Sequence, residues 1–215
     1  MKTILTAAAV FLIFTSITAI AATRSIKGKS VITGVASGGF STAGGYIPSE
    51  MTADPGFSRS IGLNYGYGVL DRLMLQCGIE FMRKPLVLKT KTPATTDTIS
   101  LNFVDFYGGG RWFFNSFYAD AGIFYGQRVL TQQIKSEENN GSSTRTIPDR
   151  CTHSDAGLYI GTGYLFRIKK NVKFDLGCRF EYGIPVVYNQ ELRGHNLDLQ
   201  TRNLSIRAGI AYTLE

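Results

Sequence analysis

The sequence is poor in charged residues, proline, cysteine and histidine. Of its 215 residues only 18% are charged, 6 are proline, 3 are cysteine and 2 are histidine. Three cysteines without a Cys-x-x-Cys pair give neither a disulfide framework nor a zinc site. With 44% hydrophobic residues the chain is too apolar for a disordered protein, and the scarcity of proline excludes a collagen-like or linker protein. The length allows one domain or two small ones.

Positive charge predominates, but it is not concentrated. The formal net charge is +7, which by itself would permit nucleic-acid binding. The Lys and Arg residues are scattered, however, and no run exceeds a pair such as Lys169-Lys170. Because nucleic-acid binding needs basic residues gathered on one surface, we expect no nucleic-acid partner.

The one long apolar run stands at the N-terminus. Met1-Lys2-Thr3 is a short positive start, residues 4–21 are apolar or small hydroxyl residues, and Ala19-Ile20-Ala21 has the small-x-small pattern of a cleavage site. The alternative is a membrane anchor, since the run is just long enough to span a bilayer. Its Ser and Thr content and its small-residue end favour cleavage, so we predict a signal peptide over residues 1–21 and a lead-in over 22–29.

After residue 25 no segment has the ~18 apolar residues that a membrane helix needs. Apolar residues instead occupy every second position, most clearly at the even positions of residues 204–214. The same period of two runs through residues 172–184, 158–166, 117–125, 73–81 and 61–69. Because successive side chains of a strand point to opposite faces, each segment is predicted to be a strand with one apolar face.

Two predicted strands are less regular. Residues 30–41 are rich in Gly, Ala and Ser, so the phase of their alternation is ambiguous. In residues 99–114 the apolar phase starts on Ile99, Leu101 and Phe103 and then moves to Val104 and Phe106, which predicts a β-bulge near Phe103-Val104. The total is about eight strands of ~9 to 13 residues, the length that a tilted strand needs to cross a bilayer.

Short and long connections alternate along the chain. The short ones are at residues 71–72, 115–116 and 169–171, and the long polar ones are at 42–57, 89–97, 131–155 and 185–203. An up-and-down barrel in the outer membrane has this pattern, with short periplasmic turns and longer outer loops. A soluble β-sandwich gives no reason to place every long loop at one end.

The second face of the predicted strands carries charged residues among glycines. They are Glu80, Asp105, Arg111, Asp120, Arg128, Asp175, Arg179, Glu181 and Arg207. Unpaired charges are costly in a sandwich core, whereas inside a small barrel opposite charges can pair. Because a bilayer excludes open sheet edges, the sheet should close on itself. We therefore predict an all-β fold, a closed up-and-down antiparallel transmembrane β-barrel of about eight strands over residues 30–215, with these nine residues as its interior charge network.

Aromatic residues gather where membrane girdles are expected. Those flanking the short turns are Trp112, Phe113, Phe114, Phe117, Tyr118, Tyr164 and Phe166, and those nearer the long loops are Phe81, Tyr125 and Tyr182. With the signal peptide and the loop asymmetry, this chain resembles the small outer-membrane β-barrels, such as the OmpA and OmpX membrane domains and the porin-family group. It departs from many of them because its last strand ends in Leu214-Glu215 and not in an aromatic residue. The resemblance implies a location in the bacterial outer membrane and insertion by the outer-membrane assembly machinery.

An eight-stranded barrel is only just wide enough for its own side chains to fill. We therefore expect a non-enzymatic structural or adhesin-like role, with an extracellular ligand bound through the outer loops and no cofactor or metal. A narrow channel and a lipid A-modifying enzyme are the alternatives. The enzyme would require His153 or His195, both in long loops, where sequence neighbours rarely converge into a catalytic triad.

A basic cluster lies near the outer end of the third strand. Arg83, Lys84, Lys89 and Lys91 are expected either to contact lipopolysaccharide phosphates or to serve as solubilising charge at the membrane boundary. Cys77 and Cys178 fall on the lipid-facing pattern of well-separated strands, so no bridge between them is expected. Cys151, in the longest loop, is expected to have no function, and the protein is expected to be a monomer.

Overall fold

The computed structural model describes residues 25–91, 95–129, 133–138, 141–146, 154–192 and 195–214. The predicted signal peptide, Cys151 and His153 lie outside these ranges, and the predictions made for them stay predictions. In the described ranges no helix is long and apolar enough to cross a membrane.

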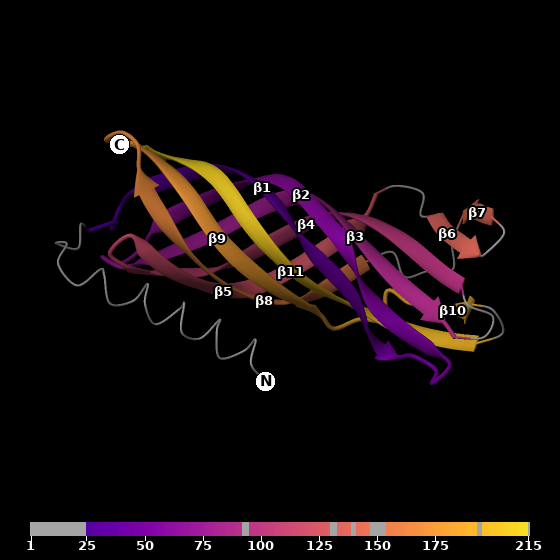
Figure 1. Ribbon diagram of the computed structural model, residues 1–215. Helices are drawn as coiled ribbons and strands as arrows, with labels where there is room; N and C mark the ends of the chain where they lie inside the picture. The colour runs from indigo at the N-terminus through magenta and orange to yellow at the C-terminus, as the bar shows by residue number, and fades with distance from the viewer. Residues whose placement is uncertain are drawn as a thin grey trace, which may run out of the picture.

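Eight antiparallel strands of the described chain close into a ring (Figure 1). They are β1 (Ser30–Tyr46), β2 (Met51–Gly68), β3 (Leu73–Thr90), β4 (Thr95–Phe114), β5 (Phe117–Arg128), β8 (Ser154–Arg167), β9 (Val172–Gly183) and β11 (His195–Leu214). Each pairs with the next one along the chain, and β1 pairs with β11 from Ser30 opposite Leu214 to Tyr46 opposite Asp198. This last pairing closes the barrel, so the predicted fold class is confirmed.

Three short strands lie at the end with the long connections: β6 (Gln133–Glu138), β7 (Gly141–Thr146) and β10 (Tyr188–Leu192). β6 pairs with the outer part of β4, β7 pairs with β6, and β10 pairs with β11. The predicted loops over residues 42–57 and 89–97 are largely strand, because β1 to β4 extend well beyond the predicted length, to 17–20 residues each. The prediction that these two stretches are connections between strands was therefore wrong for most of their residues.

The outer surface of the ring carries a broad belt of apolar side chains. Ile61, Ile123 and Ile206 are 66%, 65% and 67% exposed, and many other large apolar residues of the ring strands are exposed beside them. Soluble monomers rarely expose apolar patches of this extent, whereas a closed ring with such a belt is suited to lipid. The alternation of β1, which was ambiguous in the sequence, is defined in the structure. Ile32 and Phe40 are exposed on its outward face, whereas Thr33, Val35 and Ser41 are buried on its inward face.

Two residues of the predicted aromatic girdle lie inside the barrel. Phe113 and Tyr118 are both 4% exposed, and their rings meet edge to face with centroids 6.0 Å apart. They occupy inward positions of β4 and β5, on the same faces as Arg111 and Asp120. Trp112 and Phe114, on the opposite face of β4, are exposed as expected.

The predicted bulge near Phe103-Val104 is absent, since the register of β4 is continuous with both β3 and β5. Ile99, Leu101 and Phe103 are on the inner face, in phase with Asp105. The irregularity lies instead in β2, where Pro55 is opposite Leu86 and Arg59 is opposite Arg83, so that three residues of β2 face two of β3. One of those two is Pro85, which has no N–H to donate, and prolines inside sheets are typical of such bulges.

An apolar core fills the barrel where its strands project beyond the belt. We call this projecting part, residues 43–53, 86–90, 95–103, 187–192 and 195–203 with β6 and β7, the outer section. Its core consists of Ala43, Met51, Leu86, Leu88, Ile99, Leu101, Phe103, Ile134, Val187, Leu192, Leu197 and Leu199. Because the outside of these strands faces water and not lipid, the apolar residues turn to the inside.

Candidate functional site: the charged barrel interior

The interior next to the apolar core holds one ammonium among three carboxylates. Lys84 projects from β3 and is fully buried, and its Nζ lies 2.9 Å from Asp105 Oδ2, 3.1 Å from Asp155 Oδ2 and 3.5 Å from Glu181 Oε2. The Thr201 hydroxyl donates to Asp155 Oδ2 at 2.7 Å. Four strands, β3, β4, β8 and β9, therefore meet at this ammonium.

A second group of charges occupies the middle of the barrel. Glu80 of β3 pairs with Arg207 of β11 and with Arg179 of β9, whose Nη1 is 3.4 Å from Glu80 Oε1. The Ser60 hydroxyl donates to the other Glu80 oxygen at 2.9 Å. The Arg179 guanidinium lies between the Tyr107 and Tyr159 rings, 4.5 Å and 4.4 Å from their centroids, an arrangement in which aromatic faces attract the cation.

A third group lies toward the short turns and is centred on Arg111 of β4. Its Nη2 and Nε donate to Asp120 Oδ2 at 2.9 Å and 3.2 Å, and its Nη1 donates to Asp175 Oδ2 at 3.1 Å. The Tyr118 hydroxyl donates to Asp175 Oδ1 at 2.6 Å, and the ring of Tyr118 lies 3.8 Å from the guanidinium carbon. Gln76 donates to Asp120 Oδ2 at 3.3 Å and to the Tyr159 hydroxyl at 3.2 Å.

These three groups form one buried polar layer across the ring. It holds four cations and six carboxylates: Lys84, Arg111, Arg179, Arg207, Glu80, Asp105, Asp120, Asp155, Asp175 and Glu181. Each cation lies within 4.0 Å of at least one carboxylate. Removing one member would leave its partners as uncompensated buried charges, which is strongly unfavourable. The ion pairs of this layer therefore connect neighbouring and opposite strands of the ring, and their side chains fill the lumen.

The structure places the predicted interior residues as follows. Glu80, Asp105, Arg111, Asp120, Asp175, Arg179, Glu181 and Arg207 are buried in this layer, and Arg128 is half-buried at the outer end of β5, opposite Phe103. Asp155 was missed because it was counted as the end of a long loop, whereas it is the second residue of β8. Tyr107 and Tyr159 were not predicted as interior residues and Tyr118 was assigned to the girdle, although all three are buried on the inward faces of their strands.

The predicted lipopolysaccharide cluster is divided between the two faces of β3. Lys84 was wrongly placed there, because it shares the inward face with Glu80 and Met82 and is fully buried. Arg83, Lys89 and Lys91 are exposed. Arg83 donates to the Ser100 hydroxyl at 2.9 Å, Lys89 pairs with Asp54 at 2.6 Å, and Lys91 donates to the Ser49 carbonyl at 3.2 Å.

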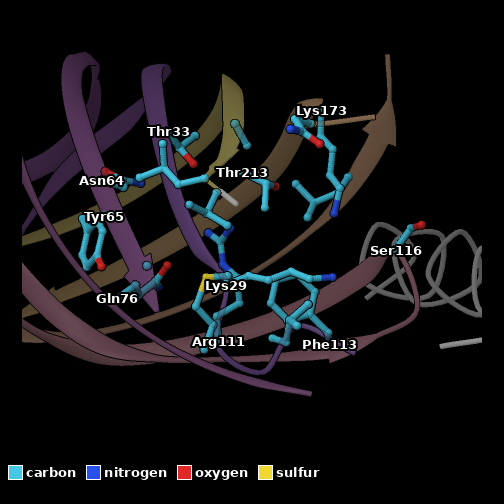
Figure 2. A pocket seen from close by; sticks show the side chains of 18 of the residues that line it. Lys29, Thr33, Asn64, Tyr65, Gln76, Arg111, Phe113, Ser116, Lys173 and Thr213 are labelled. Carbon is cyan, nitrogen blue, oxygen red and sulfur yellow. The ribbon is translucent and has the colours of Figure 1, made fainter. Parts of the chain in front are cut away.

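In the described part of the chain, no group of three or more His, Cys, Asp or Glu residues could hold a metal ion. Toward the short turns the interior opens beyond Arg111 into a cavity of about 560 Å³ (Figure 2).

No protein-family model matches the chain, and no curated protein matches it by sequence. By structure it is similar to the outer membrane protein OprG from Pseudomonas aeruginosa, with 12% identity and a TM-score of 0.50 over 91% of this chain and 100% of that one. It is also similar to Neisserial surface protein A, with 14% identity and a TM-score of 0.45 over 86% and 99%. A third is Ail, the attachment invasion locus protein of Yersinia pestis, with 16% identity and a TM-score of 0.42 over 87% and 99%.

At this level of identity the similarity to OprG shows the fold alone. The chain is a small β-barrel of the outer-membrane type. Its closed ring and its apolar belt agree with the expected location in a bacterial outer membrane.

Proposed function

We propose that this barrel is a non-enzymatic surface protein, a closed membrane anchor that holds its outer section outside the membrane for interaction with an extracellular ligand. The observation that carries the proposal is the filled interior. The charged layer spans the ring, and beyond it Leu86, Leu88 and Leu101 are all fully buried in the apolar core. A lumen filled by a charged layer and by an apolar core is suited to a membrane anchor and not to the diffusion of solutes.

The outer section offers a polar surface for such a ligand. On the outward face of β4, Thr96, Thr98, Ser100 and Asn102 form a row of half-buried hydrogen-bonding side chains. On β7, Ser142, Ser143 and Thr144 are exposed. Hydroxyl and amide groups on a rigid sheet are suited to a polar ligand such as a glycan or an extended peptide, because their hydrogen bonds are pre-positioned.

Two measurements test this role. In planar bilayers the wild-type barrel should show no steady conductance, and large regular openings would favour the channel instead. Cells that display the protein should adhere to a surface coated with extracellular matrix, and the variant Thr96→Ala/Thr98→Ala/Asn102→Ala should adhere less at equal surface abundance. Adhesion that is the same with and without the protein would refute the proposal, and a changed lipid A acyl pattern in expressing cells would favour an enzyme.

We also propose that the edge of the belt contacts lipopolysaccharide through arginine. Arg59 and Arg83 are directly opposite each other on β2 and β3, both exposed, and the next outward-facing residues toward the membrane are the apolar Ile61 and Phe81. Like charges directly opposite on a sheet are unfavourable, and an anion between them relieves the repulsion. Lipopolysaccharide should stabilise the wild-type barrel more than Arg59→Gln/Arg83→Gln, whereas Lys91→Gln should respond as the wild type does.

A further inference from the structure

Exposed basic side chains gather at the short-turn end of the ring, opposite β6, β7 and β10 (Figure 1). Among them are Lys27 of the lead-in, Arg72 of the β2–β3 turn and Lys169 of the β8–β9 turn. In the described residues of the lead-in and the short turns, the one exposed carboxylate is Asp71, whose Oδ1 accepts from the Ser25 hydroxyl at 2.6 Å. The three cations outnumber this carboxylate, so the described surface at this end is positively charged.

The backbone of the lead-in is fixed against the β2–β3 turn. The Ile26 N–H donates to the Asp71 carbonyl at 3.2 Å, and the Gly28 N–H donates to the Gly68 carbonyl at 2.7 Å. Lys27 lies between these two hydrogen bonds. The lead-in and the turn therefore present their cations on one ordered surface.

The apolar belt reaches these same turns. Leu70 is 52% exposed two residues before Arg72, and Ile168 is 55% exposed directly before Lys169. The N–H groups of Ile168 and Lys169 both donate to the Val172 carbonyl at 3.0 Å, which fixes this turn. Exposed apolar side chains are suited to acyl chains, and a basic side chain beside them reaches the level of the lipid headgroups.

The chemistry of the partner follows from this combination. Short turns of outer-membrane barrels face the periplasm, where the adjoining leaflet consists of phospholipids. Guanidinium and ammonium groups form charge-assisted hydrogen bonds with phosphate. The exposed Leu70 and Ile168 favour a membrane surface over a soluble acidic partner, because such a partner would leave both side chains in water.

We propose that the short-turn end is a docking surface for anionic phospholipids of the periplasmic leaflet. Lys27 and Arg72 bind the phosphate group of a lipid whose acyl chains lie against Leu70 and Trp112, and the β8–β9 turn repeats the combination with Ile168 and Lys169. A zwitterionic lipid binds less well, because its own ammonium group offsets the phosphate. The surface lies at the opposite end from the outer section and is independent of its role.

Trp112 reports on the lipid at this surface. It is the one tryptophan of the sequence and is 42% exposed on the outward face of β4. Its direct partner on β3 is Leu73, and the N–H of the following Phe113 donates to the Arg72 carbonyl at 2.7 Å. A lipid bound by Arg72 is therefore next to the indole ring. Bromine atoms on acyl chains quench tryptophan fluorescence on contact, so the quenching of Trp112 measures which lipid is beside it.

The barrel is refolded into phosphatidylcholine vesicles that contain a small fraction of brominated phosphatidylglycerol, or the same fraction of brominated phosphatidylcholine. A basic residue near an anionic surface gives a preference of roughly fivefold. The quenching by phosphatidylglycerol should therefore correspond to a local enrichment of at least about fivefold, and added salt should reduce it. Equal quenching by the two lipids would overturn the proposal and would leave a soluble acidic partner as the explanation of the charge.

The variant Lys27→Gln/Arg72→Gln should lose most of the preference for phosphatidylglycerol. Its quenching by brominated phosphatidylcholine should equal that of the wild type, which shows that Trp112 is still in the membrane. The matched control Arg59→Gln/Arg83→Gln removes two cations at the other edge of the belt and should keep the preference. A preference that persists in the first variant, or an equal loss in the control, would refute the site.

Discussion

The Nζ of Lys84 lies 2.9 Å from Asp105 Oδ2 inside the barrel, where the two side chains are 0% and 4% exposed. The same ammonium is shared with Asp155 and Glu181. One cation thus compensates carboxylates from three other strands, and it does so directly below the apolar core, with its Nζ 5.6 Å from the centroid of the Phe103 ring. This contact joins the charged layer of the barrel to the outer section.

Replacing this cation should cost far more stability than replacing an exposed one. Lys84→Met leaves three buried carboxylates without their shared cation, and breaking a buried ion pair in this way costs about 3–5 kcal/mol. Lys89→Met removes a surface pair with Asp54 and should cost less than about 1 kcal/mol. Urea unfolding of the two variants in lipid vesicles measures the difference. Equal stabilities would show that Lys84 is not needed to compensate the carboxylates.

The placement of Lys84 also shows where inference from sequence succeeded and where it failed. Alternation predicted the inward row of β3 through Glu80, and Lys84 continues that row four residues later. It was assigned to the surface because a lysine near a membrane boundary is usually solvated. The burial of Lys84 depends on Asp155 and Glu181, which come from distant strands, and a period of two contains no information about such partners.

The bulge that was wrongly predicted in β4 has a similar cause, because a period of two contains no information about what surrounds a strand. Apolar residues were taken to face lipid throughout, so Ile99, Leu101 and Phe103 looked out of phase with Phe106. Beyond the belt the outside is water, and there the apolar row belongs inside. The phase of the strand is constant and only its surroundings change. The strands of the ring and the short turns, which follow from local pattern, were predicted correctly, and the closure of the ring followed from the exclusion of open sheet edges by a bilayer.

Weakening the core of the outer section should loosen that section without opening the barrel. Leu101 is fully buried in the core, and Leu101→Ala is expected to cost about 2–5 kcal/mol locally. Because the membrane-spanning ring keeps its charged layer, the heat-modifiable gel mobility typical of a folded barrel should persist while protease cleavage of the outer section becomes faster. The neighbouring variant Asn102→Ala, on the outward face, is the control. Equal cleavage of the two variants would mean that the core does not hold the outer section.

Close packing between β4 and β5 should make one glycine position intolerant of a side chain. Gly109 and Gly122 are direct partners, and a Cβ at Gly122 would lie 2.2 Å from the Gly108 carbonyl oxygen and 2.7 Å from Gly109 Cα. Backbone atoms cannot move aside as a flexible side chain does, so Gly122→Ala should sharply lower the fraction of the barrel that refolds. Gly110→Ala is the control, since its Cβ would meet only Leu73 Cδ1, at 3.6 Å. Equal refolding yields would show that the strands can separate enough to admit a methyl group.

The two exposed cysteines of the ring offer a direct test of the belt. Cys77 and Cys178 are reduced and lie on the outward faces of β3 and β9, among the apolar residues Leu75, Ile79 and Phe180. A thiol reacts as its thiolate, which forms in water and not in lipid. With Cys151 replaced by Ser, a water-soluble maleimide should therefore label neither cysteine in vesicles and both after unfolding in urea.

A cysteine introduced by Lys89→Cys is the control, because the native side chain is 53% exposed in the outer section, and it should react at once in the same vesicles. If Cys77 and Cys178 were labelled as fast as that control, the outward faces of β3 and β9 would be in contact with water, and the barrel would not span the membrane through its apolar belt.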